Sequence, residues 1–258
     1  MPQPYVSLEA EFHDAFWAED DDATEVFLME RFLAAHPGRA LEIGSGSGRL
    51  LLPLLADHPE VEGLELSDDM IRLCRETAEL AGERVVVHRG DMTDWKPEAP
   101  YRSLLVPAFT FQLAGDPAAT LRHWRTLLED AGGLYLTVFT PFAELEGDME
   151  ENAWYPDHET TLPDGRTAKL DTLHKIDPEK QILERRHRYY YADSPAAFHE
   201  SRQTLRWFTL EQMHELLSAS GFQVIEAFVD FDPARPATSM EIDDSDGILT
   251  FHAVARLP

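Results

Sequence analysis

The chain has 258 residues, with 22 Lys and Arg against 48 Asp and Glu, so its formal net charge at pH 7 is −26. A field of this sign repels phosphate backbones and argues against nucleic acid as a partner, while the length suffices for one elaborated domain or two small ones. The single cysteine, Cys74, excludes an internal disulfide and a cysteine-rich metal site. No apolar stretch approaches the roughly 18 residues that span a bilayer, and residues 1–8 lack a signal-peptide pattern, so we expect a cytoplasmic protein without a membrane partner.

The first half of the chain predicts helices, followed by alternating strands and helices. Residues 1–38 have apolar side chains at helical spacing, and the acidic residues 19–22 stand where a helix N-terminus favours negative charge. Short apolar strands are expected over 40–43, 61–66, 85–87, 104–106 and 134–139, with helices over 67–82 and 117–131. This alternation favours a parallel sheet that is covered by helices on both faces.

The pattern changes between about residues 154 and 208. Strand-like runs separated by turn sequences cover 167–176, 181–191 and 200–208, and they indicate an antiparallel meander. Alternation along the second run sends Arg186 and Arg188 to one face and Arg185 to the other, which predicts a surface ladder against neighbouring acids.

Helical order returns at the end of the chain. Thr209-x-x-Gln212 has the form of a capping box and predicts a helix that ends at Gly221. Strands are then expected over 222–231 and 249–256, with a solvated acidic loop over 241–246 between them.

The segment most informative about function is the glycine-rich turn after the first strand. Glu42-Ile-Gly-Ser-Gly-Ser-Gly48 places glycines at 44, 46 and 48, which let the backbone turn sharply and approach a ligand closely. Dinucleotide-binding loops follow Gly-x-Gly-x-x-Gly, whereas the third glycine here comes one residue early. A nicotinamide-dependent oxidoreductase is therefore the less favoured reading of this loop.

Acidic residues at the ends of the next two strands favour a ligand that contains a nucleoside. Glu65 ends the second strand, where a carboxylate can accept hydrogen bonds from both hydroxyls of a ribose. Charge-assisted bonds of this kind contribute about 1.5–3 kcal/mol each. Asp91 and Met92 follow the third strand, where an acid and an apolar side chain could bracket an adenine.

Taken in order, these motifs resemble those of class I S-adenosylmethionine-dependent methyltransferases. The motifs that carry the resemblance are Glu42–Gly48, Gly63–Ser67, Gly90–Met92, Leu104–Pro107 with Phe111–Gln112, and Gly132–Leu136. The resemblance is in register over about 40–140 and looser over 207–256. It implies an α/β fold with a Rossmann-like seven-stranded sheet and helices on both faces, S-adenosylmethionine as cofactor, and methyl transfer as the activity.

The strands inserted after the fifth strand are similar to those of the branch that includes amino-sugar N,N-dimethyltransferases. This similarity implies N- or O-methylation of a small molecule, which binds under an antiparallel cover. We therefore expect a cofactor-binding domain over 1–150 and 207–258, with a helical cap over 1–38, and a substrate cover over 151–206. The oligomeric state is expected to be a monomer or a homodimer.

The resemblance also assigns cofactor contacts by position. Glu42 would orient the amino end of the cofactor, Glu65 would hold the ribose diol, and Asp91 would accept from the adenine amino group. The other implied contacts are Gly44, Ser45, Gly46, Gly48, Leu66, Met70, Met92, Val106, Pro107 and Phe111. Where relatives close a Tyr-Asp pair over the methionine moiety, this chain has His13-Asp14.

An amine or alcohol acceptor can also need a base near its proton. The candidates are His13, Tyr155, His158, Tyr189 and His199, each of which could instead be a surface or packing residue. Because in-line methyl transfer depends mainly on alignment, the fold needs no diagnostic catalytic side chain. A methyltransferase-like binding module without activity therefore remains an alternative.

Overall fold

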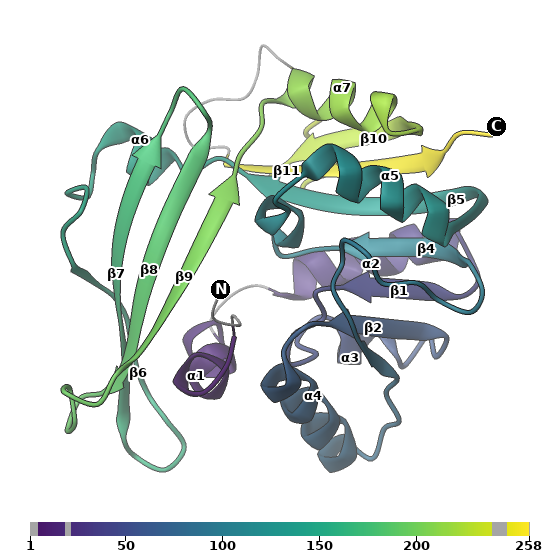
Figure 1. Ribbon diagram of the computed structural model, residues 1–258. Coiled ribbons are helices and arrows are strands. Elements are labelled where there is room, and N and C mark those ends of the chain that lie inside the picture. The colour runs from purple at the N-terminus through teal and green to yellow at the C-terminus, as the bar shows by residue number, and fades with distance from the viewer. Residues whose placement is uncertain (1–4, 19–21, 239–246, 258) are drawn as a thin grey trace.

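The computed structural model describes residues 5–18, 22–238 and 247–257. Two sheets stand side by side, and the N-terminal helix α1 (Leu8–Phe16) lies between them (Figure 1). Residues 19–21, predicted as part of an acidic helix start, and the predicted loop over 241–246 lie outside the described residues.

Sheet A, the larger sheet, has seven strands in the order β10-β11-β5-β4-β1-β2-β3. Strands β1 to β5 pair in parallel, whereas β11 runs antiparallel to both β5 and β10. Their bounds are β1 Ala40–Ile43, β2 Val61–Glu65, β3 Val87–Arg89, β4 Tyr101–Val106, β5 Leu128–Phe139, β10 Phe222–Val229 and β11 Ile248–Ala255. The prediction of a seven-stranded sheet is confirmed.

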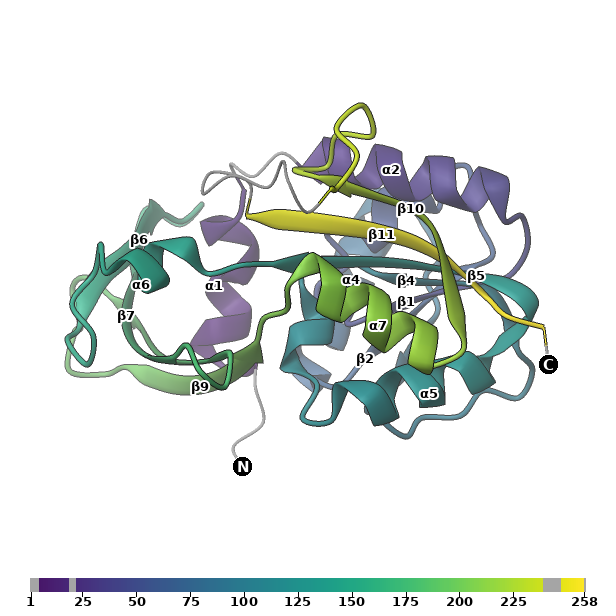
Figure 2. The same ribbon diagram turned by 90° about the horizontal axis from the view of Figure 1, so that it is seen from above.

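Helices cover both faces of sheet A, as predicted (Figure 2). One face packs against α2 (Asp22–Ala35), α3 (Leu51–Leu54) and α4 (Asp68–Ala81). The other face packs against α5 (Pro117–Leu127) and α7 (Leu210–Ala219), and two short helices, η1 (Thr110–Leu113) and α6 (Phe142–Glu146), follow β4 and β5. Each face buries its own apolar core, and burial of this kind is the main stabilising contribution to such a fold.

The helix boundaries follow from local sequence signals. The Ser67 hydroxyl accepts the Met70 N–H at the start of α4, and Gly82 ends that helix in the left-handed conformation. At the start of α7, Thr209 and Gln212 form the predicted capping box in both directions.

Several predicted boundaries in and beside sheet A are wrong: β4 begins at Tyr101 rather than at Leu104, and β5 begins at Leu128 rather than at Leu134. The Val85–Val87 run predicted a strand, but pairing with β2 begins only at Val87 and continues through His88 and Arg89. The high β propensity of the valines therefore placed the predicted strand two residues too early. Helix α5 ends at Leu127 rather than near residue 131, because Leu128 already pairs with Tyr101 on β4 and buries its side chain in the core.

Sheet B is antiparallel and consists of β6 (Tyr155–Thr161), β7 (Thr167–Asp177), β8 (Ile182–Tyr191) and β9 (His199–Arg206). The first of these strands was not predicted. It is a polar edge strand with Pro156 at a bulge, and such strands lack the apolar alternation on which sequence-based prediction relies.

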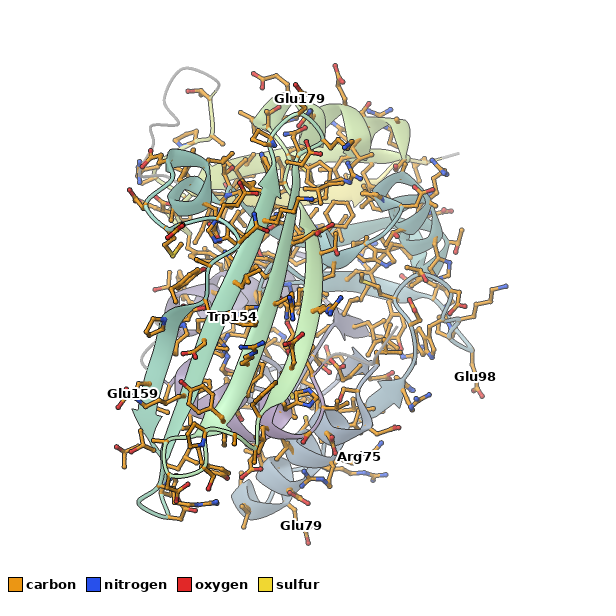
Figure 3. The ribbon with its side chains drawn as sticks, turned by 60° about the vertical axis from the view of Figure 1, so that its left-hand side comes forward. Arg75, Glu79, Glu98, Trp154, Glu159 and Glu179 are labelled. Carbon is orange, nitrogen blue, oxygen red and sulfur yellow. The ribbon has the colours of Figure 1, made fainter. Side chains whose placement is uncertain are left out.

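The outer face of sheet B carries charged side chains (Figure 3). Arg186 and Arg188 on β8 both pair with Glu200 on β9, and the Arg188 guanidinium lies 3.8 Å from the centroid of the Trp154 ring. Arg185 points to the opposite face and pairs with Glu144 of α6. The predicted ladder is confirmed.

A single glutamine joins the two sheets where the chain leaves sheet A and returns to it. The Gln112 side-chain amide donates to the carbonyls of Phe139 (2.9 Å) and Arg206 (3.1 Å), and its oxygen accepts the Phe139 N–H (2.8 Å). Because Phe139 ends β5 and Arg206 ends β9, this buried side chain fixes sheet B relative to η1.

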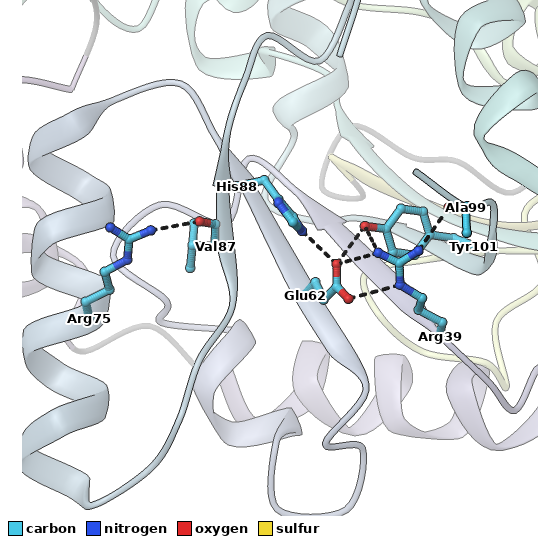
Figure 4. A network of polar contacts seen from close by, with 7 residues as sticks. All are labelled: Arg39, Glu62, Arg75, Val87, His88, Ala99 and Tyr101. Carbon is cyan, nitrogen blue, oxygen red and sulfur yellow. Dashed lines mark hydrogen bonds and ion pairs between the residues drawn. The ribbon is translucent and has the colours of Figure 1, made fainter. Parts of the chain in front are cut away.

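A polar network connects the first four strands of sheet A near their starts (Figure 4). The Glu62 carboxylate on β2 accepts two bonds from Arg39, at 3.0 and 2.9 Å, one from Tyr101 at 2.7 Å, and contacts His88 Nε2 at 2.7 Å. Burial alone would raise the pKa of Glu62, but the bonds from Arg39, His88 and Tyr101 lower it to about 2.

The Glu62→Gln variant is expected to unfold at a temperature lower by about 5–10 °C at pH 7. Since the folded-state pKa lies below the ordinary value of 4.5, the carboxylate stabilises the fold above pH 4.5 and loses this effect as the pH falls towards 2. Thermal unfolding of both proteins at pH 7 and pH 3 checks this, and the difference should shrink at pH 3. Glu76→Gln, which breaks an exposed pair with Arg72, is the matched control and should change little. An equal deficit at both pH values would contradict the assignment.

Candidate functional site

The glycine loop crosses the carboxyl end of sheet A between β1 and α3. Gly44, Gly46 and Gly48 all have positive φ angles, of 76°, 54° and 88°, so the backbone adopts the left-handed region three times in five residues. A Cβ added at Gly48 would lie 2.6 Å from Cys74 Sγ, whereas one added at Gly46 would meet nothing within 4 Å. Gly48 thus serves packing, and Gly46 borders open space.

Glu65 holds this loop from the neighbouring strand. One carboxylate oxygen accepts the Gly46 N–H at 2.9 Å, and the other accepts the N–H groups of Leu66 and Ser67, both at 2.7 Å. The oxygen that bonds Gly46 retains a lone pair for a further donor. Glu65 therefore couples the loop to the end of β2 and can still accept a hydrogen bond from a ligand.

Glu42 is a buried carboxyl group with an unsatisfied oxygen. It is the last residue but one of β1, is 2% exposed, and its Oε2 atom has no hydrogen-bond partner. Burial, and next the nearby charge of Glu25, raise the pKa of Glu42 well above its usual range. An orphaned acceptor of this kind requires an external donor or a proton.

The loop after β4 completes this edge of the sheet. Ala108 and Phe109 have φ angles of 49° and 61°, which are strained values for residues with a side chain. The Phe109 N–H donates to the Thr137 hydroxyl at 3.4 Å, and the Ala108 N–H interacts with Glu25 of α2. Since the strand order reverses between β4 and β1, the edge is a topological switch point, where α/β sheets bind ligands.

The N-terminal segment closes over this edge. Asp14 accepts hydrogen bonds from the Ser47 hydroxyl of the glycine loop and from His13. Burial would raise the pKa of Asp14, yet these two hydrogen bonds lower it. Further along, the Ser67 hydroxyl donates to the Tyr5 carbonyl at 2.6 Å, so the segment also contacts the start of α4.

A second cluster of polar groups lies between α1 and the inner face of sheet B. Glu9 of α1 accepts from the Tyr189 hydroxyl at 3.3 Å, the Ser201 hydroxyl at 2.9 Å and the Tyr5 N–H at 2.7 Å. Burial raises the pKa of Glu9, and burial followed by the charge of Glu9 raises that of Tyr189. His199, which faces Tyr189 across the β8–β9 pair, has a buried Nε2 atom without a partner.

The five candidate bases therefore fall into separate places. Tyr189 and His199 share the cluster around Glu9, with ring centroids 6.4 Å apart. His13 contacts Asp14, which bonds the glycine loop, and its ring is 5.9 Å from that of Tyr5. His158 lies on β6, where its ring packs against Trp17 and Phe16. Tyr155 contacts His174 and belongs neither to the Glu9 cluster nor to the contacts of His13.

The predicted cofactor contacts differ in how much surface they present. Leu66 and Asp91 are exposed and Met92 is half-buried, although one Asp91 oxygen is engaged by Thr93. Met70 and Val106 retain 1% exposure or less, so they back the site rather than line it. Ser45, Gly48 and Pro107 are also buried, while Gly44 and Gly46 are partly open.

The prediction that Phe111 contacts the cofactor is wrong. Its side chain is fully buried in the core, where the ring lies 5.5 Å from Trp124 and 5.6 Å from Phe208. It therefore has no surface to offer a cofactor, and an aromatic residue within a motif was mistaken for a ligand contact.

Sequence reasoning missed three residues that the structure brings to the carboxyl edge of sheet A or to the polar cluster around Glu9. Tyr5 and Glu9 precede the motifs, and Glu25 is one of several acids on α2, so none of them stands in a recognisable spacing. The resemblance led us to look for a phenol at position 13. The structure instead brings the Tyr5 ring beside His13, with its hydroxyl accepting from Gln203 at 3.1 Å.

Comparisons with known proteins agree with this geometry. The model of a family described as a methyltransferase domain matches residues 21–227. The chain belongs to this family. The predictions of a methyltransferase with S-adenosylmethionine as its cofactor are confirmed at this level. No curated protein matches the sequence significantly.

Solved structures share the fold over nearly the whole chain. An S-adenosylmethionine-dependent methyltransferase from Clostridium acetobutylicum has a TM-score of 0.75 at 9% identity, covering 96% of this chain and 97% of that one. The CcbJ methyltransferase from Streptomyces caelestis gives 0.71 at 23% identity, covering 95% and 96%. The sugar N-methyltransferase KedS8 from Streptoalloteichus gives 0.70 at 21% identity, covering 95% and 93%.

The residues at the carboxyl edge of sheet A fit S-adenosylmethionine. The open space at Gly46 can take a ligand, the orphaned Glu42 oxygen suits a cationic donor, and Glu65 retains an acceptor site for a hydroxyl. Across the described ranges, no group of three or more His, Cys, Asp and Glu side chains is arranged to hold a metal ion. Nor does any helix of the described chain have the length and hydropathy to cross a membrane.

Two alanine substitutions separate ligand binding from packing in the glycine loop. Gly46→Ala is expected to fold with a modest loss of stability from its positive φ, of order 1 kcal/mol, and to weaken S-adenosylmethionine binding more than tenfold. Gly48→Ala should destabilise the fold more strongly, because its Cβ would collide with Cys74 and Leu52. Thermal unfolding and calorimetric titration distinguish them, and unchanged affinity in a folded Gly46→Ala protein would refute the assignment of Gly46.

The Glu65→Ala variant is expected to weaken cofactor binding at least tenfold, because it removes both the acceptor for the ribose and the anchor of Gly46. Isothermal titration with S-adenosylmethionine measures the effect. Glu79→Ala, an exposed change on α4, should bind as the parent protein does. A dissociation constant equal to that of the parent would rule out the role of Glu65.

Proposed function

We propose that this methyltransferase transfers the methyl group of S-adenosylmethionine to an amino group of a small, polar molecule bound against the inner face of sheet B. S-adenosylmethionine supplies the methyl group as an electrophile on a sulfonium. The observation that carries the proposal is the buried, unpartnered His199 Nε2 atom on that face, beside Glu9 and within the fold that binds the cofactor.

The inner face of sheet B has a polar middle between two apolar ends. Leu170 forms one end, on which Phe12 and Phe16 of α1 pack, and Leu183 and Leu205 form the other, beside Trp207 just after β9. Between them lies what we call the polar belt: Thr172, His174, Arg185, His187, Ser201 and Gln203. A surface with this many donors and acceptors suits an acceptor molecule that carries several hydroxyl or amino groups.

Similarity to a solved relative supports an amine as the acceptor. KedS8 is described as a sugar N-methyltransferase, and it shares the fold over nearly the full length of both chains. His174 Nδ1 in the polar belt is buried without a partner, as His199 Nε2 is. Two such nitrogens on one face provide positions at which a polar acceptor could be oriented.

The protein's contribution to the reaction is alignment, exclusion of water and acceptance of a proton. An amine reaches the site largely as an ammonium and must lose a proton before or during transfer. We assign that proton to His199 Nε2, with the Glu9 carboxylate stabilising the resulting imidazolium. Tyr189 holds its own proton, because burial and Glu9 raise its pKa. We expect a small molecule as the partner, without nucleic acid or membrane, and a monomer or homodimer.

Calorimetric titration with S-adenosylmethionine, S-adenosylhomocysteine and NAD tests the cofactor. A methyl-transfer screen over amines, amino sugars and hydroxylated metabolites then tests the acceptor. We expect binding of both sulfur nucleosides, none of NAD, and transfer to an amine. Binding of NAD alone would favour an oxidoreductase, and cofactor binding without transfer to any acceptor would favour an inactive binding module.

His199→Gln is expected to lower kcat on the order of 10²-fold, because it removes the proton acceptor while preserving a polar side chain. S-adenosylmethionine affinity should not change, and His214→Gln on the exposed side of α7 serves as the control. An unaltered kcat would exclude His199 as the base.

A further inference from the structure

One guanidinium reaches the inner face of sheet B, and a carboxylate of the protein already occupies it. Arg185 points to this face from β8, and its Nε and Nη2 atoms both donate to the same oxygen of Glu144 on α6, Nε at 2.9 Å. This edge of the guanidinium is the one that binds a carboxylate or a phosphate through two parallel hydrogen bonds. The protein itself therefore fills the edge of Arg185 that suits a phosphate best.

The two members of this ion pair differ in their contact with solvent. The Glu144 side chain is 3% exposed, whereas that of Arg185 is 26% exposed. The guanidinium also lies 5.6 Å from the centroid of the Phe139 ring at the end of β5. A ligand on this face would meet the open side of Arg185, whose charge the enclosed Glu144 carboxylate offsets.

The other cations of sheet B cannot serve the inner face. Arg186 and Arg188 lie on the outer face, where they pair with Glu200 at 2.7 and 3.3 Å. The alternation of side chains along β7 and β9 sends the Lys and Arg residues of these two strands to the outer face as well, and β6 contains none. Among the strands of sheet B, Arg185 is thus the single Lys or Arg residue of the inner face.

Carboxyl groups outnumber this cation on the inner face. Glu9 of α1 accepts hydrogen bonds from side chains of β8 and β9, and the Thr172 hydroxyl of β7 donates to Asp157 of β6 at 2.6 Å. With Glu144, three carboxyl groups stand against the guanidinium of Arg185. A negatively charged ligand is therefore repelled by this face, whereas an ammonium group is attracted to it.

The polar groups beside Arg185 are neutral. His174 pairs with Arg185 across β7 and β8, is 1% exposed, and has an Nδ1 atom without a hydrogen-bond partner. The Tyr155 ring lies 6.0 Å from that of His174, and burial raises the pKa of Tyr155 to about 12, so its hydroxyl keeps its proton. Burial, and next the charge of Arg185, lower the pKa of His187 to about 4. Neutral donors and acceptors of this kind suit hydroxyl groups.

We propose that the acceptor is a polyhydroxylated amine that carries no phosphate group, and that Glu144 is a residue that determines this specificity. Glu144 withholds the Nε–Nη2 edge of Arg185 from the acceptor and offsets the charge of this cation. Hydroxyl groups of the acceptor bind at His174 and Tyr155 instead. The inference rests on the proposed function, which it restricts to amines that are neither esterified with phosphate nor attached to a nucleotide.

Steady-state kinetics with glucosamine and glucosamine 6-phosphate test the substrate class, because the two compounds differ by one phosphate group. If the screen finds a better amine, that amine and its phosphate ester replace them. We expect kcat/KM of the parent protein to be lower for the phosphate ester by about tenfold or more, mainly through KM. A smaller difference would overturn the inference while the proposed function stands. Transfer to no amine, with or without phosphate, would overturn the proposed function.

The Glu144→Gln variant tests the residue. It frees the guanidinium edge and removes one negative charge, and the partly exposed Arg185 stays in contact with water. We expect the discrimination against the phosphate ester to fall by about tenfold or more. Glu146→Gln, an exposed change on the same helix, is the matched control and should discriminate as the parent does.

The affinity for S-adenosylhomocysteine checks that each variant is folded. Unchanged discrimination by a folded Glu144→Gln protein would remove Glu144 from this role. If the variant does not fold, the comparison of the two sugars with the parent protein still decides whether the acceptor is free of phosphate.

Discussion

The site depends on one carboxylate that joins two neighbouring strand ends. Glu65, at the end of β2, accepts N–H groups from its own strand's exit and from the glycine loop after β1. Gly44 and Ser45 reinforce this link, since both donate to the Leu64 carbonyl. Without these hydrogen bonds, the three glycines with positive φ would leave the loop free to adopt many conformations. By fixing the loop at Gly46, Glu65 determines where the open space lies and which backbone groups border it.

Part of the chain's excess of acidic residues is concentrated at the carboxyl edge of sheet A, around the glycine loop. Most of the surplus is spread over the surface, but Glu25, Glu42 and Glu65 are all less than a tenth exposed around the same loop. Their charges would be unfavourable together in an apolar environment, and Arg49 offsets only part of them. A ligand with a positive end is therefore complementary to the site, whereas a dinucleotide, with its negatively charged pyrophosphate, is not.

The sequence predicted the features that are encoded locally. Strands β1 and β2, the glycine loop between β1 and α3, and the caps of α4 and α7 each depend on residues within a few positions of one another, and all of them are confirmed. The missed features depend on distant partners. Helix α5 ends where Leu128 meets Tyr101, and β6 forms because β7 offers it an edge. Phe111 shows the converse error, in which a motif position suggested a ligand and tertiary packing placed the side chain in the core.

The candidate site also divides into features encoded locally and features that depend on residues distant in sequence. The cofactor motifs lie on the strands of one sheet, so their order along the chain already places them at one edge. Glu9 and Tyr189 are 180 residues apart in sequence, and Tyr5 and Gln203 are 198 apart, so no local pattern could bring them together. Gln112 makes their meeting possible, because it fixes the points at which the chain leaves for sheet B and returns. The proposed acceptor side is thus built from long-range contacts between α1 and sheet B, and we expect substitutions there to alter the choice of acceptor without disturbing the strand ends at which we expect the cofactor to bind.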